Sequence, residues 1–414
     1  MAIATTGKDV LAKFFDEGAY SALYADGAVT AAFGSANGTP VYAVCQTGAA
    51  VAEKDTEKVV KVLDMAAKTG NPVVTFYNSV GAKLEEGLAA LSGSAAVAAA
   101  VAKVSGVVPQ IAVVTGVCGA GSALAAAAAD VCIVSKEGEL FLTAPFTSAA
   151  AGDKLEGAGS AEFAAKAGVA AIVVDSAEEA AAKAAELVGL LPANNLAGPA
   201  LFDFAAPSKA LDLVKYTAAD AVAALADEGS AVELYAGYGK NIVTALATIN
   251  GSAVGIVATE KKALCHKCTA KAARFVRLCD AYSIPIVTIV NTEGFGRSEG
   301  DDEAGGIRQA ARMAGVYAEA TTVKVAVLAG EAVGPAYTVF AACADWRVAV
   351  QGCTVAPLAP EAAVTVLYKD EIFASDNIVN ATKAKAAAYT KEVCSADAAV
   401  ANGSADAVAD AATA

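Results

Sequence analysis

A single histidine in 414 residues leaves little room for the commonest side-chain catalysts. A Ser-His-Asp or Cys-His arrangement would have to use His266, which lies outside the glycine-rich turns of the chain. The sequence also has no G-x-x-x-x-G-K-[ST] loop and no G-x-G-x-x-G after a strand-like run, so these two kinds of phosphate cradle are not expected. These absences direct attention to chemistry that the backbone can perform.

Long apolar runs and basic charge are scarce as well. Hydrophobic residues make up 56% of the chain, but Asp, Glu, Lys and Gly interrupt its alanine-rich segments. No run approaches the roughly 20 apolar residues of a membrane span, and the N-terminus lacks the order of a secretory signal, so we expect a cytoplasmic protein. A net charge of −14 argues against a nucleic-acid partner bound through its phosphates.

The nine cysteines are scattered, which indicates reduced core residues in a cytosolic enzyme. One spacing stands apart, because Cys265-His266-Lys267-Cys268 has the C-x-x-C form. Structural zinc takes four ligands and no second pair lies nearby, so we expect no bound metal. The pattern favours the start of a helix ahead of Lys271 over metal or redox chemistry.

The chain repeats itself about 213 positions apart. Lys58 opens KVVKVLDMAAKTGNPVVTFYN, and Lys271 opens KAARFVRLCDAYSIPIVTIVN, with Pro72 and Pro285 at matching places. After an insertion, the copies continue as IAVVTGVCGAGSALAAAAADVCIVS and VAVLAGEAVGPAYTVFAACADWRVAV. This period is too long for a solenoid and suits two copies of a whole domain.

Each copy predicts the same series of elements: a hairpin, a helix, a strand, an insertion, a second strand, a small-residue turn, a helix and a last strand. The hairpins are signalled by Asn37-Gly38 and Asn250-Gly251. Alternating strands and helices indicate an α/β fold with mainly parallel pairing. The segment 190–212, rich in Pro, Asn and Gly, favours domains at residues 1–200 and 201–414, and the tail from Ser395 is weakly patterned.

The small-residue turns are the places where chemistry is expected. A helix N-terminus exposes unpaired N–H groups, and small residues let a carbonyl oxygen approach them as in an oxyanion hole. The turns are GVCGAG at 116–121 and GEAVGPA at 330–336. Tight strand–helix packing alone could explain one such turn, but its recurrence favours a binding site. The acidic pairs Glu85-Glu86 and Asp301-Asp302 are interpreted as solvated charges.

Motifs in order along the chain carry a family resemblance. SVGAKLEEG at 79–87 resembles SGGAR-x-x-EG, and GVVPQIAVVTGVCGAG at 106–121 resembles GVVPQ…GPCAGG. LPANN at 191–195 resembles LP-x-NN, and KAARFVRLCDAYSIPIVTIVNTEGF resembles KAARF-x-R-x-CDAF-x-IP…D-x-PGF. VAPLAPEAAV at 355–364 resembles IAVMGPEGAV. The chain thus looks like the carboxyltransferase subunit of biotin-dependent acyl-CoA carboxylases and decarboxylases.

The resemblance implies two tandem crotonase-like (ClpP/crotonase) ββα superhelix domains in the α/β class. In that family one half holds the acyl-CoA and stabilises the thioester enolate, and the other stabilises the biotin ureido oxygen as CO2 leaves. The biotin nitrogen then takes the α-proton, so no protein base is needed. By position, Ala120 and Gly121 serve the acyl-CoA half, while Gly334 and Ala336 serve the biotin half. The further binding residues implied are Gly81, Ala82, Lys83, Gly119, Gly294, Phe295, Gly334 and Tyr337.

The implied partners are a biotin carboxyl carrier protein with a biotin carboxylase, or the membrane subunit of a decarboxylase. Active sites formed between halves of two subunits imply a homo-oligomer built on dimers, with a hexamer plausible. The direction of transfer stays open, since an acyl-CoA decarboxylase α subunit fits the same motifs. A non-catalytic assembly paralogue and a plain CoA-thioester hydratase or hydrolase are the alternatives. The last of these would require a glutamate near the first turn, and none follows Gly121 in GSALAAAAA.

Some positions depart from the family pattern. Its Tyr-Gly-Gly-Ala-Tyr turn is Val333-Gly334-Pro335-Ala336-Tyr337 here, and proline has no N–H to offer a ligand. The arginine of SGGAR is Lys83, which keeps the charge but not the planar fork. Pro335 is therefore the departure that bears most directly on function.

Overall fold

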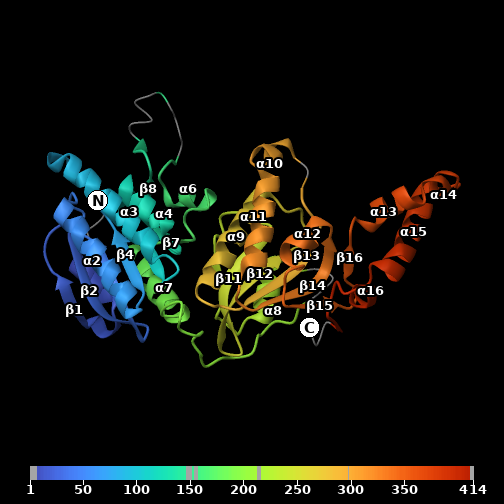
Figure 1. Ribbon diagram of the computed structural model, residues 1–414, viewed down its shortest axis with the longest axis horizontal. Helices are drawn as coiled ribbons and strands as arrows, with labels where there is room; N and C mark the ends of the chain where they lie inside the picture. Colours follow the sequence, from blue (N-terminus) through green and yellow to red (C-terminus); the bar gives the residue numbers. More distant parts are fainter. Residues whose placement is uncertain (1–6, 146–151, 153–156, 212–215, 297, 411–414) are drawn as a thin grey trace. The chain divides into compact units, whose positions relative to one another are not determined.

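The computed structural model describes residues 7–145, 152, 157–211, 216–296 and 298–410 (Figure 1). The chain divides into two compact units, and each contains a sheet covered by helices. Unit 1 comprises Met1–Ala200 with Leu234–Tyr238, and unit 2 comprises Leu201–Glu233 with Gly239–Ala414. Among the described residues, no helix is long and apolar enough to cross a membrane.

The sheet of unit 1 has seven strands in the order β1-β2-β3-β4-β5-β7-β9. The first three pair antiparallel, and pairing is parallel from β3 to β9. Strands β6 and β8 form a separate parallel pair. The strands span Tyr20–Tyr24 (β1), Val29–Ala36 (β2), Thr39–Gln46 (β3), Val73–Tyr77 (β4), Gln110–Val114 (β5), Val117–Gly119 (β6), Val131–Ser135 (β7), Glu139–Phe141 (β8) and Ile172–Val174 (β9).

Helices cover both faces of this sheet. Helix α2 packs on β2 and β3 and against α3, whereas α1 and α7 pack together and α7 also contacts β5 and β7. Small alanines allow this close approach, and several are fully buried, including Ala66, Ala126 and Ala184. The helical elements span Gly7–Phe14 (α1), Asp16–Gly18 (η1), Glu53–Thr69 (α2), Leu84–Glu86 (η2), Leu88–Val104 (α3), Gly121–Ala128 (α4), Ala161–Lys166 (α6) and Ala177–Leu190 (α7).

The sheet of unit 2 repeats this plan, with the order β10-β11-β12-β13-β14-β15-β17 and β16 paired to β14. Strands β11 and β12 form an antiparallel hairpin, and pairing is parallel from β12 to β17. The strands span Val232–Leu234 (β10), Ile242–Ile249 (β11), Ser252–Thr259 (β12), Ile286–Thr292 (β13), Lys324–Val333 (β14), Trp346–Val350 (β15), Thr354–Ala356 (β16) and Ala407–Ala409 (β17).

The helices of unit 2 follow the same arrangement until β16, after which α13, α14 and α15 pack on one another. Their small core holds Val364, Ile372 and Ala386. The helices span Ala218–Leu225 (α8), His266–Ala281 (α9), Glu299–Glu303 (α10), Gly306–Glu319 (α11), Pro335–Phe340 (α12), Pro360–Leu367 (α13), Lys369–Phe373 (α14), Ile378–Val393 (α15) and Ala396–Ala401 (α16).

The two hairpin predictions are confirmed. Asn37 and Gly38 both have positive φ values, 48° and 75°, and Asn250 and Gly251 have 50° and 75°. These are the conformations of a two-residue turn that matches the twist of the flanking strands. The hairpins therefore follow directly from the Asn-Gly dipeptides.

The weak pattern of the tail from Ser395 concealed regular structure. The side chain of Ser395 caps α16, and β17 then adds to the edge of the sheet beside β15. Asp406 accepts two hydrogen bonds from the guanidinium of Arg347, at 3.0 Å each, and one from its backbone N–H. Alanine-rich sequence gives no alternation of polarity, so tertiary pairing decides this strand.

Candidate active site

In unit 1, the turn before α4 holds its backbone in an unusual conformation. Ala120 has φ 50° and ψ −119°, a backbone region that residues other than glycine rarely adopt. Its N–H is donated to the carbonyl of Phe141 at 3.1 Å. The next N–H, that of Gly121, begins the helix and has no hydrogen-bond partner among the described residues. The turn thus presents the Gly121 N–H as a backbone donor where the helix starts.

A second loop brings another donor to the same place. Gly81, with φ 114°, accepts a hydrogen bond from the N–H of Val51 at 2.9 Å and donates to the Ser79 hydroxyl at 3.1 Å. The N–H of Lys83 binds the carbonyl of Val51 at 2.9 Å. Between these anchors, the N–H of Ala82 has no partner among the described residues. The loop therefore holds Ala82 in position without using its donor.

The two donors line one cavity of about 540 Å³, together with Gly81, Gly119 and Ala120. Its wall includes Gln46, whose amide Nε2 lies 3.4 Å from the Ser122 hydroxyl. Two unpaired N–H groups on one cavity can stabilise a developing negative charge on a carbonyl oxygen. Unit 1 thus brings together Gly81, Ala82, Gly119, Ala120 and Gly121 from the residues that the sequence suggested.

Lys83 does not belong to this group. Its ammonium lies 3.5 Å from Glu86, and 46% of its side chain is exposed. Glu86 also accepts a hydrogen bond from the Glu53 N–H at the start of α2, at 2.7 Å. The sequence suggested that Glu86 is a solvated charge. In the structure it also caps the start of α2.

Unit 2 repeats the geometry. Gly334 precedes α12 with φ 56° and ψ −129°, close to the values at Ala120, and its N–H binds the carbonyl of Ala356 at 2.8 Å. Gly294, with φ 92°, accepts from the Leu264 N–H at 2.8 Å, as Gly81 does from Val51. The Phe295 N–H has no partner among the described residues. Phe295 therefore corresponds to Ala82, and Pro335 to Gly121.

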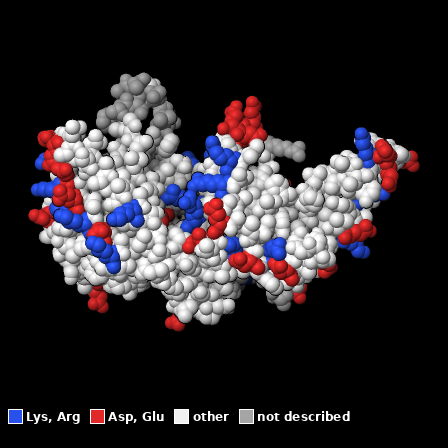
Figure 2. All heavy atoms as spheres, in the orientation of Figure 1, with Lys and Arg blue, Asp and Glu red and all other residues white. Residues whose placement is uncertain are grey.

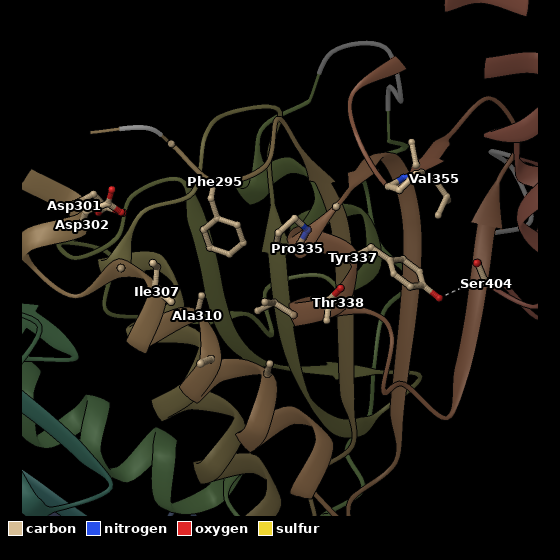
Figure 3. A pocket seen from close by; sticks show the side chains of 18 of the residues that line it. Phe295, Asp301, Asp302, Ile307, Ala310, Pro335, Tyr337, Thr338, Val355 and Ser404 are labelled. Atoms are coloured by element: carbon tan, nitrogen blue, oxygen red, sulfur yellow. Dashed lines mark hydrogen bonds between the residues drawn. The ribbon is translucent and has the colours of Figure 1, made fainter. Parts of the chain in front are cut away.

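Figure 3 shows the cavity of unit 2, of about 1060 Å³, with Phe295 from one loop and Pro335 from the other. Gly334 and Tyr337 also line it. Ala336 is fully buried and does not face this cavity. The structure thus brings Phe295, Gly334 and Tyr337 together, supports them with Gly294, and places Ala336 behind the surface.

Below the turns, the two units share a close contact between a glycine and an asparagine. A Cβ added to Gly116 would lie 2.2 Å from Oδ1 of Asn78, and one added to Gly330 would lie 2.2 Å from Oδ1 of Asn291. Only glycine allows this approach. Asn78 directly follows β4, and Asn291 is the second-last residue of β13, where its Oδ1 also accepts a hydrogen bond from the Glu331 N–H at 3.0 Å. The requirement for glycine at the start of the turn is therefore the same in both units.

Residues 8–414 match the carboxyl transferase domain family. This chain belongs to that family. The methylmalonyl-CoA carboxyltransferase 12S subunit of Propionibacterium freudenreichii subsp. shermanii is 34% identical over 85% of this chain and 72% of its own length. The methylmalonyl-CoA decarboxylase subunit alpha of Propionigenium modestum is 29% identical over 94% and 83%.

A solved structure agrees with the sequence relatives. The transcarboxylase 12S hexamer, with methylmalonyl-coenzyme A and methylmalonic acid bound, superposes with a TM-score of 0.91 over 98% of this chain and 86% of that one, at 29% identity. The predicted resemblance and the tandem crotonase-like fold are confirmed. The protein is a carboxyltransferase of the biotin-dependent acyl-CoA group.

In this carboxyltransferase, Tyr337 is held by its hydroxyl rather than left free. The hydroxyl donates to the carbonyl of Ser404 at 2.7 Å, and Nη1 of Arg347 lies 3.3 Å from the same oxygen. Because Arg347 also binds Asp406, the ring is fixed between α12 and the C-terminal strand. Its ring forms part of the cavity wall, and Figure 3 shows the hydrogen bond that ties it to Ser404.

Sequence reasoning missed two polar groups at these cavities. Asp301, interpreted as a solvated charge, lines the unit 2 cavity and accepts from the N–H of His266 at 2.9 Å; its Oδ1 also lies 2.5 Å from Nδ1 of the ring. Gln46 is the last residue of β3 and lines the unit 1 cavity. This position could be predicted only from the order of the strands in the sheet. Among the described residues, no group of three or more His, Cys, Asp or Glu side chains could hold a metal ion.

Proposed function

We propose that this carboxyltransferase moves a carboxyl group between biotin on a carrier protein and a short-chain acyl-CoA. One observation carries the proposal: at the cavity of each unit, a loop N–H that has no partner among the described residues lies beside the start of a helix. Relatives named for methylmalonyl-CoA and propionyl-CoA support a short branched or linear acyl group. The acyl-CoA half corresponds to residues 1–200 and the biotin half to residues 201–414.

In the acyl-CoA half, Ala82 and Gly121 would bind the thioester oxygen. When the bond between the α-carbon and the carboxylate breaks, its electron pair moves onto this oxygen as an enolate. The two N–H groups stabilise that charge, and neither is engaged by another group of the described residues. The carboxyl group joins the biotin ureido nitrogen, whose proton goes to the α-carbon, so no protein side chain has to act as base. The reverse sequence carboxylates the acyl-CoA.

In the biotin half, Phe295 supplies the loop donor and Pro335 supplies none. Gly334 cannot replace it, because its N–H is already bound to Ala356. The ureido oxygen would therefore have one backbone donor fewer here than the thioester oxygen has in unit 1. We infer a weakened biotin site rather than a lost one, since the cavity and the Phe295 N–H are retained.

Exposed apolar side chains support a homo-oligomer. Soluble monomers rarely leave such groups clustered on short helices. They occur around α3 and α4, where the face shown in Figure 2 carries few charges, and on α13–α15, where the same face carries both acidic and basic side chains. They include Leu84, Leu88, Leu91, Leu124, Val366, Leu367, Phe373 and Val379. The transcarboxylase 12S structure is described as a hexamer assembly, and light scattering would give the mass of this one.

The test is a transfer assay with free biotin. Purified protein is mixed with biotin and methylmalonyl-CoA or malonyl-CoA labelled in the free carboxylate, and loss of label from the thioester is followed. Biotin-dependent loss supports the proposal. Binding of CoA thioesters without transfer would point to a non-catalytic assembly subunit, and thioester hydrolysis or hydration without biotin would point to a plain crotonase-type enzyme.

A further inference from the structure

Two cysteine thiols lie side by side at the start of α9. Cys265 is the residue that precedes the helix, and Cys268 is in its first turn. Their sulfur atoms are 3.3 Å apart. Cys265 is half-buried, whereas Cys268 is fully buried. A pair with one reachable and one sheltered sulfur is the arrangement in which one thiol can attack and the other can resolve.

The same helix in the other unit is built without cysteine. Ala52 and Asp55 occupy the equivalent positions at the start of α2. There the Asp55 carboxylate accepts from the Ala52 N–H at 3.2 Å and binds Lys58 at 2.9 Å. The fold therefore has a thiol-free way to begin this helix. The dithiol is an addition of unit 2 that the architecture does not require.

The surroundings favour the thiolate at one sulfur only. The Cys268 thiol donates toward Cys265, and the N–H groups of Cys268 and Lys267 point to the same sulfur, which lowers the pKa of Cys265 to about 6. The shared hydrogen bond and burial raise the pKa of Cys268. Burial also raises the pKa of five other thiols, those of Cys45, Cys118, Cys279, Cys353 and Cys394. A thiolate at a helix N-terminus is the reactive form of cysteine.

We propose that Cys265 and Cys268 form a redox-active dithiol that exchanges with low-molecular-weight disulfides and that its oxidation changes the unit 2 cavity. The Cys265 thiolate attacks one sulfur of the disulfide, so the S–S bond breaks, a mixed disulfide forms and one thiolate leaves. Cys268 then loses its proton and attacks the Cys265 sulfur, releasing the second thiolate. The protein dithiol is oxidised and the small disulfide is reduced to two thiols.

The residues on either side of Cys265 connect it to the cavity. Leu264 pairs with the loop that carries Phe295, donating to Gly294 at 2.8 Å and accepting from Gly296 at 2.9 Å. His266 binds Asp301, and both Phe295 and Asp301 line the cavity. Closing a disulfide has to draw the two sulfurs together from 3.3 Å to about 2.05 Å. This movement would shift Cys265 and the adjacent Leu264, which holds the Phe295 loop in place. This coupling rests on the proposed biotin-side role of the cavity, whereas the dithiol chemistry does not.

The first experiment measures the thiols themselves. The full-length protein is equilibrated with mixtures of oxidised and reduced glutathione, quenched with acid, alkylated and analysed by peptide mass spectrometry. We expect a Cys265–Cys268 disulfide, two hydrogen atoms lighter than the dithiol. The alkylation rate of Cys265 should rise with a midpoint near pH 6, while the exposed Cys343 serves as the comparison thiol in the same digest.

Two variants make the assignment specific. Cys268→Ala should accumulate a stable mixed disulfide with glutathione at Cys265, because no resolving thiol remains. Cys265→Ser should form neither species at position 268. Two free thiols under fully oxidising glutathione, or a Cys265 alkylation profile that coincides with that of Cys343, would overturn the dithiol proposal in the wild-type protein, whatever the variants do.

A second experiment tests the coupling. The oxidised and reduced proteins are compared in the biotin-dependent transfer assay, and the KM for biotin should differ at least threefold while the KM for acyl-CoA stays the same. Equal values would overturn the coupling and leave the dithiol standing. Absence of transfer in both states, with the disulfide still forming, would overturn the proposed function instead, so the two failures are distinguishable.

Discussion

Gly121 and Pro335 are each the first residue of a helix, and each follows a residue with φ near 50° and ψ near −120°. In the part of the chain that the structure describes, nothing binds the N–H of Gly121, which lines the cavity of its unit, whereas Pro335 has no N–H. Proline suits the first helical position, so the substitution keeps the fold of the turn while removing its donor. The difference between the two units is therefore chemical rather than architectural.

Restoring the missing donor should strengthen the biotin half. We expect Pro335→Ala to raise kcat/KM for biotin by about tenfold or more, since one such donor is typically worth 10²–10³ in rate when fully engaged. Steady-state transfer from methylmalonyl-CoA at varied biotin concentrations measures the effect. Pro360→Ala is the matched control, because Pro360 also begins a helix, α13, but does not line the cavity. Equal gains in both variants would contradict the donor explanation.

Ala120 should be a source of strain in unit 1. A residue with a side chain in this backbone region costs roughly 1–3 kcal/mol of stability. A new glycine removes that cost, but it destabilises the folded state by about 0.4–1 kcal/mol because it makes the unfolded chain more flexible. We therefore expect Ala120→Gly to raise the free energy of unfolding by about 1 kcal/mol, seen as a higher urea midpoint. The reverse change in unit 2, Gly334→Ala, should lower stability, since its new Cβ would also lie 3.1 Å from the Pro357 carbonyl. An unchanged or lower midpoint in Ala120→Gly would show that the turn is not strained.

Because of Lys271, the free energy of unfolding should increase as the pH rises from about 8 to 10.5. Its side chain is fully buried, and burial lowers the pKa of the ammonium to about 8 from 10.5, against the attraction of Glu233 at 3.8 Å. Below pH 8 the folded protein carries a charge that it disfavours, and between pH 8 and 10.5 the folded state loses this charge before the unfolded chain does. The contribution of Lys271 to stability thus increases by about 3 kcal/mol across this window.

Lys271→Met provides the comparison, because it removes the titrating group and keeps a long apolar stem. The difference in free energy of unfolding between the wild type and this variant should shift in favour of the wild type between pH 7.5 and 10.5. Urea unfolding at each pH measures it. A difference that stays constant over this range would mean that Lys271 titrates as an ordinary exposed lysine.

Much of the fold could be predicted because the signals were local or repeated. The Asn37-Gly38 and Asn250-Gly251 turns have their own backbone requirements, and the duplicated segments supported each other. Strand β17 and helix α16 could not be predicted, since their alanine-rich sequence has no periodicity and depends on pairing with β15. The edge strand β1, Tyr20–Tyr24, was missed because its residues remain mostly exposed.

The candidate site was predicted only in part, for a physical reason. Glycine turns can be recognised in sequence, but an N–H is a candidate donor only if nothing else binds it. Ala336 was suggested by position, yet it is fully buried. The Phe295 N–H has no partner within the described ranges, because Leu264 holds the residues on both sides. Asp301 became part of the cavity through His266, a contact between residues 35 positions apart. Such pairings depend on tertiary structure.

The most direct test of the backbone-donor mechanism compares Gly121→Pro with Gly121→Ala in labelled carboxyl transfer from methylmalonyl-CoA to free biotin. Both variants add a Cβ, which meets Ser94 at about 3.0 Å, but only proline removes the N–H. We predict that Gly121→Pro lowers kcat by about 10²–10³, or roughly 2.7–4 kcal/mol, relative to Gly121→Ala. Equal activity of the two folded variants would contradict the claim that this backbone donor stabilises the enolate.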